Sequence, residues 1–428
     1  MFSIFVAHQP VRLRRALAIG AAIAALSAPS VGAAQDLSLS DALSRVATGD
    51  PSVAVNAARL QAADAAVIQA DVRPRDVVGV DVEDFTGTGP YSSLGRSQAT
   101  AWYERTWERG GKREARVGAA RFELGVTAER NRLRMLDLLA QVQATWVEAL
   151  AAEAVISIAE QRLAAAQQVE GEVGRRVGRA LDPLFAAERA RTTTTQARIA
   201  LDQARENARI ARTTLASYWG ATGGDYSLDT TPFTIVERSR PPADVGPELA
   251  LLTAERDAAG AKVRLAETSN VGDPSARVGL RHFGQGNDVA IMVGGSIPLG
   301  NRAANRGNVA RANAEAQVAE AEIAVARAQI GREIDRIVAE RAALATEIDR
   351  IAREVLPSAA RAVTLVRDGF ARGGTAFTFL EVNQAQQAEV DARSRRVELL
   401  RRFHLAGARL DRLTGRHVPY LSSAENRR

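Results

Sequence analysis

The chain has 428 residues, of which 46% are hydrophobic, 25% are charged and 5% are aromatic. This apolar content excludes an intrinsically disordered protein, and the absence of cysteine excludes disulfides, thiolate metal sites and cysteine nucleophiles. The formal net charge is +6, but Arg12, Arg14 and Arg15 lie in an N-terminal leader, and without them 53 basic residues face 50 acidic ones, so we expect no nucleic-acid partner.

Residues 1–34 have the layout of a secretory signal peptide. The three arginines precede the apolar run Ala16–Leu26, and small residues follow at 31–34. The run is about half as long as the ~18 apolar residues of a membrane anchor. We therefore expect cleavage near Ala33 or Ala34 and export. No later segment reaches transmembrane-helix length without charges, so a mature membrane protein would have to cross the bilayer with strands.

The mature chain contains two repeats with the same order of elements: a helix, two strands, a long helix, a turn and a returning helix. We place the first repeat at 35–219 and the second at 247–416. A linker rich in glycine and proline connects them at 220–246, and a tail follows at 417–428.

The first repeat opens with a helical pattern over 39–72, interrupted at Gly49-Asp50-Pro51. Apolar and polar residues then alternate at 78–83 and 98–107, which predicts two strands. A long helix follows to a turn at 178–184, and a returning helix runs to about Trp219. In the second repeat the corresponding ranges are 247–267 for the helix, 276–283 and 289–299 for the strands, and 372–377 for the turn.

The second long helix holds a seven-residue apolar repeat, which is typical of a coiled coil. Its members are Val309, Ala316, Ile323, Ile330, Ile337, Leu344 and Ile351. Each long helix spans about 65 residues, or on the order of 100 Å at 1.5 Å per residue. We expect a kink or local break at Pro357.

Four strands of nine or ten residues have the length of tilted membrane strands, but four cannot close a barrel. Copies must therefore join, giving eight strands from two chains or twelve from three. Strands that short also suit two small soluble hairpins capping a coiled coil, and this alternative stays open from the residues.

Three stretches resemble the TolC-type outer-membrane channel family. Two of them match the passages from strand to long helix: 107–113 (Trp-Glu-Arg-Gly-Gly-Lys-Arg) and 296–302 (Ser-Ile-Pro-Leu-Gly-Asn-Arg). The third, 377–386 (Phe-Thr-Phe-Leu-Glu-Val-Asn-Gln-Ala-Gln), is similar to the start of the last helix in the family's heavy-metal (cobalt-zinc-cadmium type) branch. Together with the duplicated order of elements, the resemblance covers nearly all of the mature chain.

The resemblance implies a mainly α fold with membrane β structure: a homotrimer with a twelve-stranded barrel in the outer membrane and a helical tunnel, an α-barrel of antiparallel helices, in the periplasm. It implies no covalent chemistry and no cofactor. The partners would be outer-membrane lipid, a periplasmic adaptor (membrane fusion protein) and an inner-membrane resistance-nodulation-division pump, and the cargo would be heavy-metal cations.

Carried over to this sequence, the periplasmic mouth and adaptor-docking surface fall on the two helical turns, at Gly178, Leu181, Leu184, Gly374, Thr375, Phe377 and Leu380. Glu381 occupies one position of an acidic ring near the mouth. The family commonly has a second acid where this chain has Gln384, which weakens the expectation of a cation-selective ring.

Other functional classes find little support in the residues. There is no nucleophile motif, phosphate loop or paired-histidine helix, so we expect no catalytic residue. The mature histidines, His282, His404 and His417, lack ligand spacing, so we expect no metal site. Trp102, Tyr103 and Trp107 suit a bilayer interface or ordinary strand packing. The remaining alternatives are a periplasmic coiled-coil spacer or adaptor, and a channel for drugs or secreted proteins.

Overall fold

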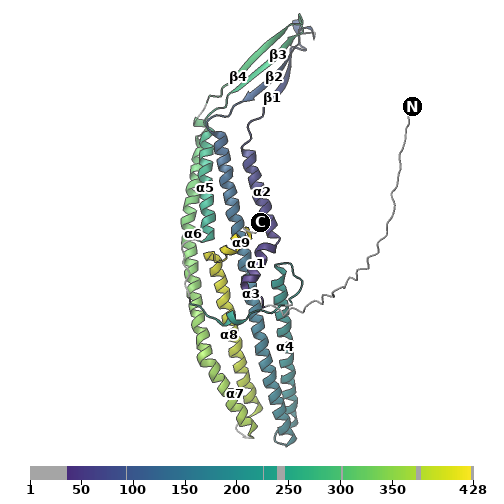
Figure 1. Ribbon diagram of the computed structural model, residues 1–428, viewed down its shortest axis with the longest axis vertical. Helices are drawn as coiled ribbons and strands as arrows, with labels where there is room; N and C mark the ends of the chain where they lie inside the picture. Colours follow the sequence, from purple (N-terminus) through teal and green to yellow (C-terminus); the bar gives the residue numbers. More distant parts are fainter. Residues whose placement is uncertain are drawn as a thin grey trace, which may run out of the picture. The chain divides into compact units, whose positions relative to one another are not determined.

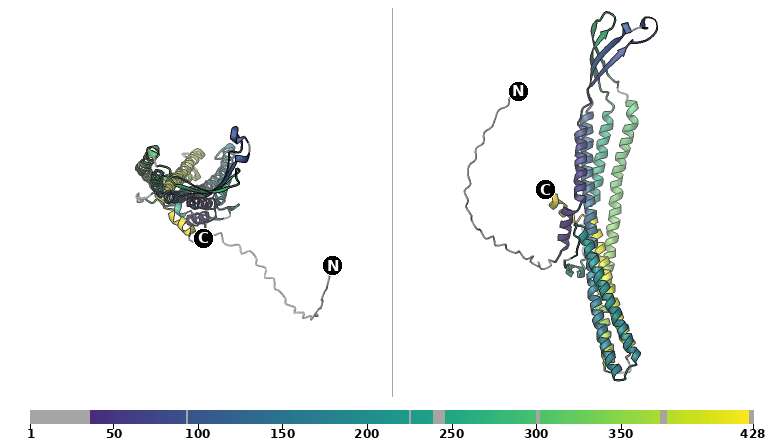
Figure 2. Two further views of the ribbon diagram at one scale, coloured as in Figure 1. Left: turned by 90° about the horizontal axis from the view of Figure 1, so that it is seen from above. Right: turned by 90° about the vertical axis from the view of Figure 1, so that its right-hand side faces the viewer.

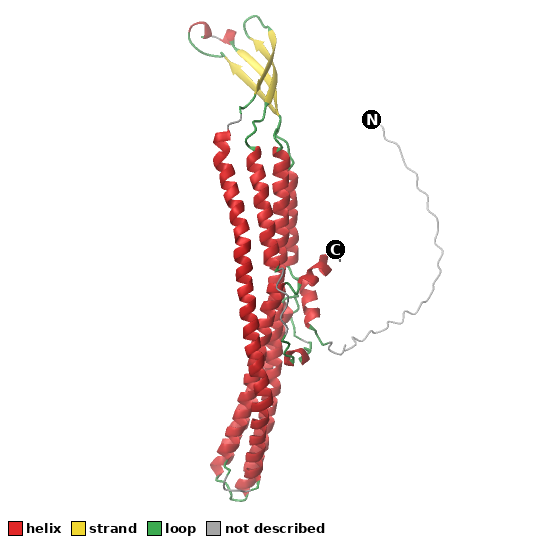
Figure 3. Cartoon of the chain, turned by 90° about the vertical axis from the view of Figure 1, so that its left-hand side faces the viewer, coloured by secondary structure: helices red, strands yellow, loops and turns green. Residues whose placement is uncertain are grey.

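The computed structural model describes residues 36–92, 94–224, 226–238, 246–299, 302–372 and 377–425. The segment Met1–Gln35 is a separate unit outside this description, so the signal peptide at 1–34 stays a prediction. The remainder, Asp36–Arg428, is one compact unit that combines long helices with a four-stranded sheet. Within it the sheet lies at one end of the long helices and the helical turns lie at the other (Figures 1 and 3).

The elements follow the predicted order within a few residues. The first repeat comprises α1 (Leu39–Gly49), α2 (Ser52–Ala70), β1 (Val77–Glu83), β2 (Gln98–Thr106), α3 (Lys112–Gly178) and α4 (Leu184–Ser217). The second comprises α5 (Pro247–Thr268), β3 (Ser275–Phe283), β4 (Val289–Ser296), α6 (Arg302–Arg350), α7 (Leu356–Ala371) and α8 (Phe379–Thr414). A short helix, α9 (Val418–Glu425), lies in the tail, and a 3-10 helix, η3 (Thr231–Thr234), lies in the linker.

The break between α1 and α2 follows from local chemistry. Ser38 caps α1 by accepting a hydrogen bond from the Asp41 N–H at 3.2 Å, while Asp41 binds the Ser38 N–H in return. At the other end, Asp50 leaves the helical region with ψ 137° and precedes Pro51, which restricts the residue before it to extended backbone. Ser52 then begins α2 with its N–H bound to the Asp50 carboxylate at 2.7 Å.

The second long helix changes its winding beside Pro357, as predicted. The segment Ile351–Val355 forms a π-helical turn between α6 and α7, and the Leu356 N–H donates to the Ile351 carbonyl five residues earlier. Proline has no N–H to donate, and it occupies one of the first two positions of α7. The wider π-helical turn before it accommodates the missing hydrogen bond.

The heptad of the second long helix faces neighbouring helices. Ile323, Ile337, Leu344 and Ile351 are buried, and Val309, Ala316 and Ile330 are half-buried. The partners are α5 on the sheet side and α8 toward the turns. In the first repeat, α3 includes a stretch with the length and hydropathy of a membrane-spanning helix, and 44% of that stretch is buried inside the protein. Packing of α3 on α1, α4 and α8 accounts for its apolar composition.

The helical region is a wall one helix thick. Near the sheet, α2 packs on α3, α3 on α5 and α5 on α6; toward the turns, α4 packs on α3, α3 on α8, and α8 on α6 and α7. Among the described residues, α2 makes no comparable contact with α6, nor α4 with α7. Seen from above, the helices lie in a curved row (Figure 2). In the described part of a single chain, both edges of the wall therefore have no neighbouring helix.

The strands form one antiparallel sheet in the order β1-β2-β3-β4. The two repeats meet at its centre, where β2 pairs with β3 from Gln98↔Phe283 to Thr106↔Ser275. At the helical end, Asp273 strengthens this join by accepting hydrogen bonds from the Arg109 N–H at 3.0 Å and Lys112 Nζ at 2.7 Å. The sheet is thus a single unit rather than two separate hairpins, with β1 and β4 as its edges.

Candidate functional site

The two faces of the sheet differ in chemistry. The strand pairing places mostly apolar residues on one side, here called the apolar face: Val78, Val80, Val82, Ala99, Ala101, Tyr103, Val278, Leu280, His282, Val289, Ile291 and Val293. The other side, the polar face, carries Asp81, Glu83, Gln98, Thr100, Glu104, Arg277 and Arg281. Large apolar side chains such as Ile291 and Val293 are 74% and 81% exposed. A sheet with one apolar and one polar face suits a barrel wall between lipid and water.

Ion pairs across the strands organise the polar face. Arg277 on β3 binds Glu104 on β2 at 2.7 Å, and Arg281 binds Glu83 on β1 at 2.9 Å. Arg281 Nε also donates to Thr100 Oγ1 at 2.8 Å. These contacts give the charged groups partners on the sheet itself. On a surface facing lipid, no water would be present to solvate the remaining polar atoms. The polar face therefore suits a water-filled interior.

The three aromatic residues singled out from the sequence lie on different sides of β2. Trp102 is on the polar face, where its indole packs over Gly79 and under the Arg277 guanidinium, 3.8 Å from the ring centroid. A Cβ at Gly79 would lie 2.3 Å from Trp102 Cζ2, so this packing needs glycine. Tyr103 lies on the apolar face, and Trp107 follows β2 with 46% exposure. Tyr103 and Trp107 thus suit a bilayer interface, whereas Trp102 packs within the polar face.

The turn between α3 and α4 is closed by Ala180. Its φ is +54°, and the following Leu181 N–H donates to the Arg176 carbonyl at 2.9 Å, which satisfies the end of α3. Gly178, the glycine that the sequence places in this turn, is instead the last residue of α3 and keeps helical backbone. Alanine is found here because the hydrogen bonds of the turn offset the cost of its conformation.

Replacing Ala180 with glycine is expected to stabilise the turn. Glycine adopts a positive φ without the Cβ clash, which costs an L-residue about 1–2 kcal/mol, and part of that gain is offset by the greater entropy of the unfolded glycine chain. The expected result is slower hydrogen exchange of the amides at 178–184. Gly178→Ala serves as the matched control and should leave exchange unchanged or slow it slightly, because that residue is helical. Faster exchange in Ala180→Gly would contradict the assignment.

Arg176 joins the two helical turns. Its guanidinium binds Asp182 through Nε and Nη2 at 2.7 and 3.2 Å, and Nη1 donates to the Phe370 carbonyl in α7 at 2.8 Å. The same guanidinium lies 4.4 Å from the centroid of the Phe370 ring. Its side chain is only 12% exposed. Sequence reasoning missed this residue, although an arginine six positions before an aspartate across a turn is a detectable signal.

Apolar packing joins the same two turns. Val169 and Val173 of α3, Ala186 and Ala190 of α4, Phe370 of α7 and Val382 of α8 form one buried cluster, with Phe377 and Phe379 against it. Phe377 approaches α7 closely, because a Cβ at Gly369 would lie 2.2 Å from Phe377 Cδ2. The predicted site residue Phe377 is therefore half-buried, with part of its ring packed against this cluster.

The other predicted mouth residues divide into two groups. Leu181, Leu184 and Leu380 expose their side chains, with relative exposures of 58%, 79% and 46%. Phe185, which the sequence analysis did not select, is 69% exposed beside Leu184. Gly374 and Thr375 lie outside the described residues. The described part of the two turns thus presents a group of exposed leucine and phenylalanine side chains.

Glu381 caps α8. Its carboxylate accepts hydrogen bonds from the Thr378 N–H at 2.5 Å and from the Thr378 hydroxyl, which completes a capping box. These hydrogen bonds from the Thr378 hydroxyl and N–H lower the pKa of Glu381, so the carboxylate is charged at neutral pH. The residue is thus a structural cap as well as a fixed negative charge near the turn.

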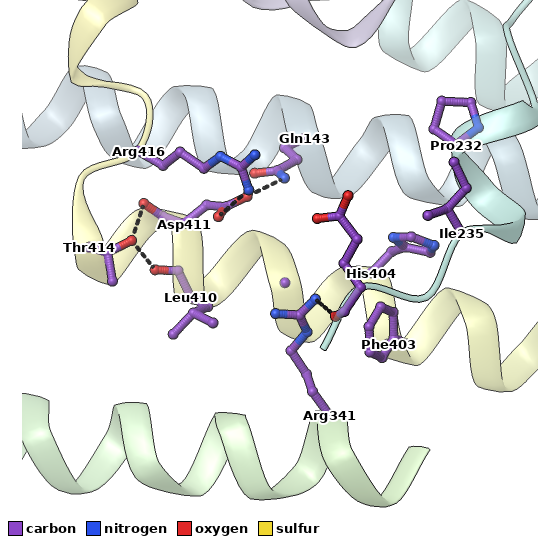
Figure 4. Close-up of a pocket in the computed structure, with 12 residues that line it drawn as sticks. Gln143, Pro232, Ile235, Arg341, Phe403, His404, Leu410, Asp411, Thr414 and Arg416 are labelled. Atoms are coloured by element: carbon purple, nitrogen blue, oxygen red, sulfur yellow. Dashed lines mark hydrogen bonds and ion pairs between the residues drawn. The ribbon is translucent and has the colours of Figure 1, made fainter. Parts of the chain in front are cut away.

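A cavity of about 580 Å³ lies where the linker packs against α3, α6 and α8 (Figure 4). His404 Nε2–H donates to the Phe233 carbonyl at 2.9 Å, and Arg341 Nη2 donates to the Glu237 carbonyl at 3.3 Å while stacking on Phe403. These bonds attach the described part of the linker to the helices. The cavity therefore marks a structural junction between the repeats.

The histidines have structural surroundings. Burial lowers the pKa of His404 and of His417, which keeps both rings neutral at pH 7. The His417 Nε2 atom lies 2.7 Å from Gln143 Oε1, and Gln143 donates to Asp411 at 2.8 Å. Within the described ranges, no group of three or more metal-ligating side chains occurs.

Two curated proteins resemble the chain over most of its length. It is 25% identical over 396 residues to the cobalt-zinc-cadmium resistance protein CzcC of Cupriavidus metallidurans, covering 90% of this chain and 91% of CzcC. It is 28% identical over 333 residues to the nickel-cobalt-cadmium resistance protein NccC of Alcaligenes xylosoxydans xylosoxydans, covering 74% of this chain and 73% of NccC. No model of a known protein family matches the chain.

Solved structures of outer-membrane proteins share the fold. CusC, described as undergoing conformational changes during folding and transmembrane channel formation, superposes with a TM-score of 0.71 at 17% identity, covering 88% of this chain and 92% of CusC. The outer-membrane protein VceC of Vibrio cholerae superposes with a TM-score of 0.67 at 19% identity, covering 88% and 96%. The long helical wall and the four-stranded sheet are thus the fold of these proteins.

Proposed function

We propose that this chain, which belongs to the TolC-type family of outer-membrane channels, is the outer-membrane exit channel of a tripartite efflux system. The observation that carries the proposal is the division of the sheet into an apolar and a polar face. A soluble hairpin cap would place such a face against protein, whereas here its valines and isoleucines are exposed. The channel conducts passively and performs no covalent chemistry.

The chain works as a homotrimer. Its sheet has two free edges, β1 and β4, and its helical wall has two unlike edges, α2 with α4 and α6 with α7. Because the two edges differ, one edge of each copy contacts the opposite edge of the next copy, head to tail. Such contacts close into a ring when the rotation between neighbouring copies allows it. Three copies would give a twelve-stranded barrel continuous with a helical tunnel, with no strand edge left in lipid.

The cargo is heavy-metal cations. Support comes from the names of the two curated relatives, which are cobalt-zinc-cadmium and nickel-cobalt-cadmium resistance proteins. In the test, the chain is deleted from its host, and cell-associated cobalt, zinc and cadmium are measured before and after complementation. Metal accumulation that the wild-type chain reverses is the expected result. Unchanged metal together with accumulated drug or dye would contradict the metal assignment and favour a drug channel, and a soluble periplasmic chain would favour the spacer alternative.

The turns dock a periplasmic adaptor, which links the channel to a resistance-nodulation-division pump. The surface consists of Gly178, Leu181, Leu184, Gly374, Thr375, Phe377 and Leu380, of which Leu184 is the most exposed among the described members. Its leucine side chains have few neighbours in the single chain, as expected of side chains that pack on a partner.

Leu184→Asp is expected to abolish metal efflux while the trimer still forms in the membrane. The side chain is 79% exposed, so aspartate costs little folding stability but cannot pack in an apolar interface. Efflux and trimer content are measured together. Thr192→Asp is the control: Thr192 is exposed on α4 about two helical turns after Leu184, and its replacement should retain efflux. Normal efflux in Leu184→Asp would remove Leu184 from the docking surface.

Glu381 contributes a ring of three negative charges near the mouth. Glu381→Gln is expected to lower the cation preference of single channels in planar bilayers, because the ring loses its charge. Glutamine also serves in capping boxes, so α8 should keep its start. Glu188→Gln, on an exposed face of α4, is the matched control. Unchanged selectivity in Glu381→Gln would leave the residue as a helix cap only.

A further inference from the structure

Arg105 lies at the helical end of the apolar face. The register of β2 and β3 alternates sides, so Arg105 follows Ala99, Ala101 and Tyr103 on that face and pairs with Ala276. An arginine at the margin of an apolar surface places its charge where lipid meets water. Figure 1 places this end of the sheet next to the first turns of α3.

Aromatic side chains accompany Arg105 on both sides. The Arg105 guanidinium lies 6.0 Å from the Trp107 ring centroid, and Tyr103 and Trp107 are 39% and 46% exposed. The nearest carboxylate, on Asp76, is 3.9 Å from Arg105 Nε and accepts a hydrogen bond from Tyr103 Oη at 2.6 Å. At 3.9 Å the ion pair is too long for a hydrogen bond, so the guanidinium, which is 45% exposed, keeps donors for another anion.

The two ends of the sheet differ in charge. The segments at the helical end, 71–76, 105–116, 268–275 and 303–308, contain eight basic and five acidic residues. The basic residues are Arg73, Arg75, Arg105, Arg109, Lys112, Arg113, Arg116 and Arg306, and the acidic ones are Asp71, Asp76, Glu108, Glu114 and Asp273. In the connections at the other end, residues 84–97 and 284–288, the charges are Asp84, Arg96 and Asp288. A phosphate-bearing headgroup is therefore favoured at the helical end.

We propose that Arg105 binds the phosphate group of an anionic phospholipid in the bilayer leaflet nearest the helices. This site rests on the proposed membrane function. The guanidinium supplies two parallel N–H donors to the phosphate oxygens, and Tyr103 and Trp107 lie at the headgroup level, where amphipathic rings are favoured. Asp76 opposes the bound anion and limits its affinity.

The test titrates the purified trimer with phosphatidylglycerol, phosphatidylcholine or inorganic phosphate and counts bound molecules by native mass spectrometry. We expect wild type to bind phosphatidylglycerol more tightly than phosphatidylcholine. Arg105→Gln should weaken phosphatidylglycerol binding about fivefold, the effect of one charge near an anionic surface, and Arg105→Lys should retain most of it. Asp76→Asn should strengthen binding. Arg198→Gln, at an exposed position of α4, is the matched control and should bind like wild type.

Equal binding of both lipids by wild type, or equal affinities of wild type and Arg105→Gln, would overturn the site. Competition by inorganic phosphate as strong as by the lipid would also overturn it, because the ligand would then be a free anion. Failure of the wild-type trimer to retain any lipid would count against the membrane function itself. Association with phosphatidylcholine without a preference would leave that function intact and reject only the Arg105 site.

Discussion

Replacing Ile291 with arginine is expected to prevent stable membrane insertion, whereas the same replacement at Met292 leaves insertion largely intact. Ile291 lies on the apolar face at 74% exposure, and its neighbour Met292 lies on the polar face opposite Gly279. An arginine facing lipid near the bilayer midplane costs about 2–4 kcal/mol per chain. The penalty arises three times in a trimer, whereas an arginine facing water costs little.

The measurement is the amount of heat-sensitive oligomer in outer-membrane fractions of both variants. The two substitutions differ by one position along β4, so expression and local strand propensity are matched. Equal insertion of both variants would contradict the assignment of the faces. If Met292→Arg failed to insert while Ile291→Arg inserted normally, the two faces would be reversed, and the ion-paired face would lie toward lipid.

Replacing Arg176 with alanine is expected to release the α3–α4 turn from α7. The substitution leaves the Asp182 carboxylate, 18% exposed, and the Phe370 carbonyl without their main partner. Removing one partner of a buried ion pair costs about 3–5 kcal/mol, and the partial exposure of Asp182 reduces this to roughly 2–3 kcal/mol. Amides at 176–182 and 368–372 should exchange much faster in hydrogen-exchange measurements.

The neighbouring Arg175 offers a matched control for Arg176. Its side chain is 64% exposed and pairs with Glu172 within α3, and such surface pairs contribute about 0.3–0.5 kcal/mol. In Arg175→Ala, the amides at 176–182 and 368–372 should therefore exchange at the wild-type rate. Similar protection in Arg176→Ala and Arg175→Ala would show that the apolar cluster holds the two turns together without the ion pair.

The fold followed closely from the sequence because its signals are periodic and long. The alternation at 78–83 and 289–299, the heptad from Val309 to Ile351 and the position of Pro357 each predict local backbone, and the structure bears them out, except that the last strand ends at Ser296. The TolC-type fold predicted from the strand-to-helix motifs is confirmed by the solved structures that share it.

The details of the turns depend on contacts between distant residues, which single-sequence patterns do not reveal. Glycine is the residue type that favours a positive φ, yet Ala180, two residues after Gly178, adopts it. The Ala180 and Leu181 N–H groups donate to the Val177 and Arg176 carbonyls, and these hydrogen bonds fix the turn at that position. The contact of Arg176 with Phe370 joins positions 194 residues apart. Similarly, Trp102 packs inside the polar face because Gly79, on the neighbouring strand, leaves room for its indole.

Outer-membrane fractionation with an unboiled gel shows whether the chain forms an oligomeric barrel in the membrane. We expect the mature chain in the outer-membrane fraction, running as an oligomer of three chains that dissociates on heating, because the free edges of the sheet must pair with other copies. A monomer soluble in the periplasm would contradict the channel. It would leave the apolar face of the sheet for a protein partner instead of lipid.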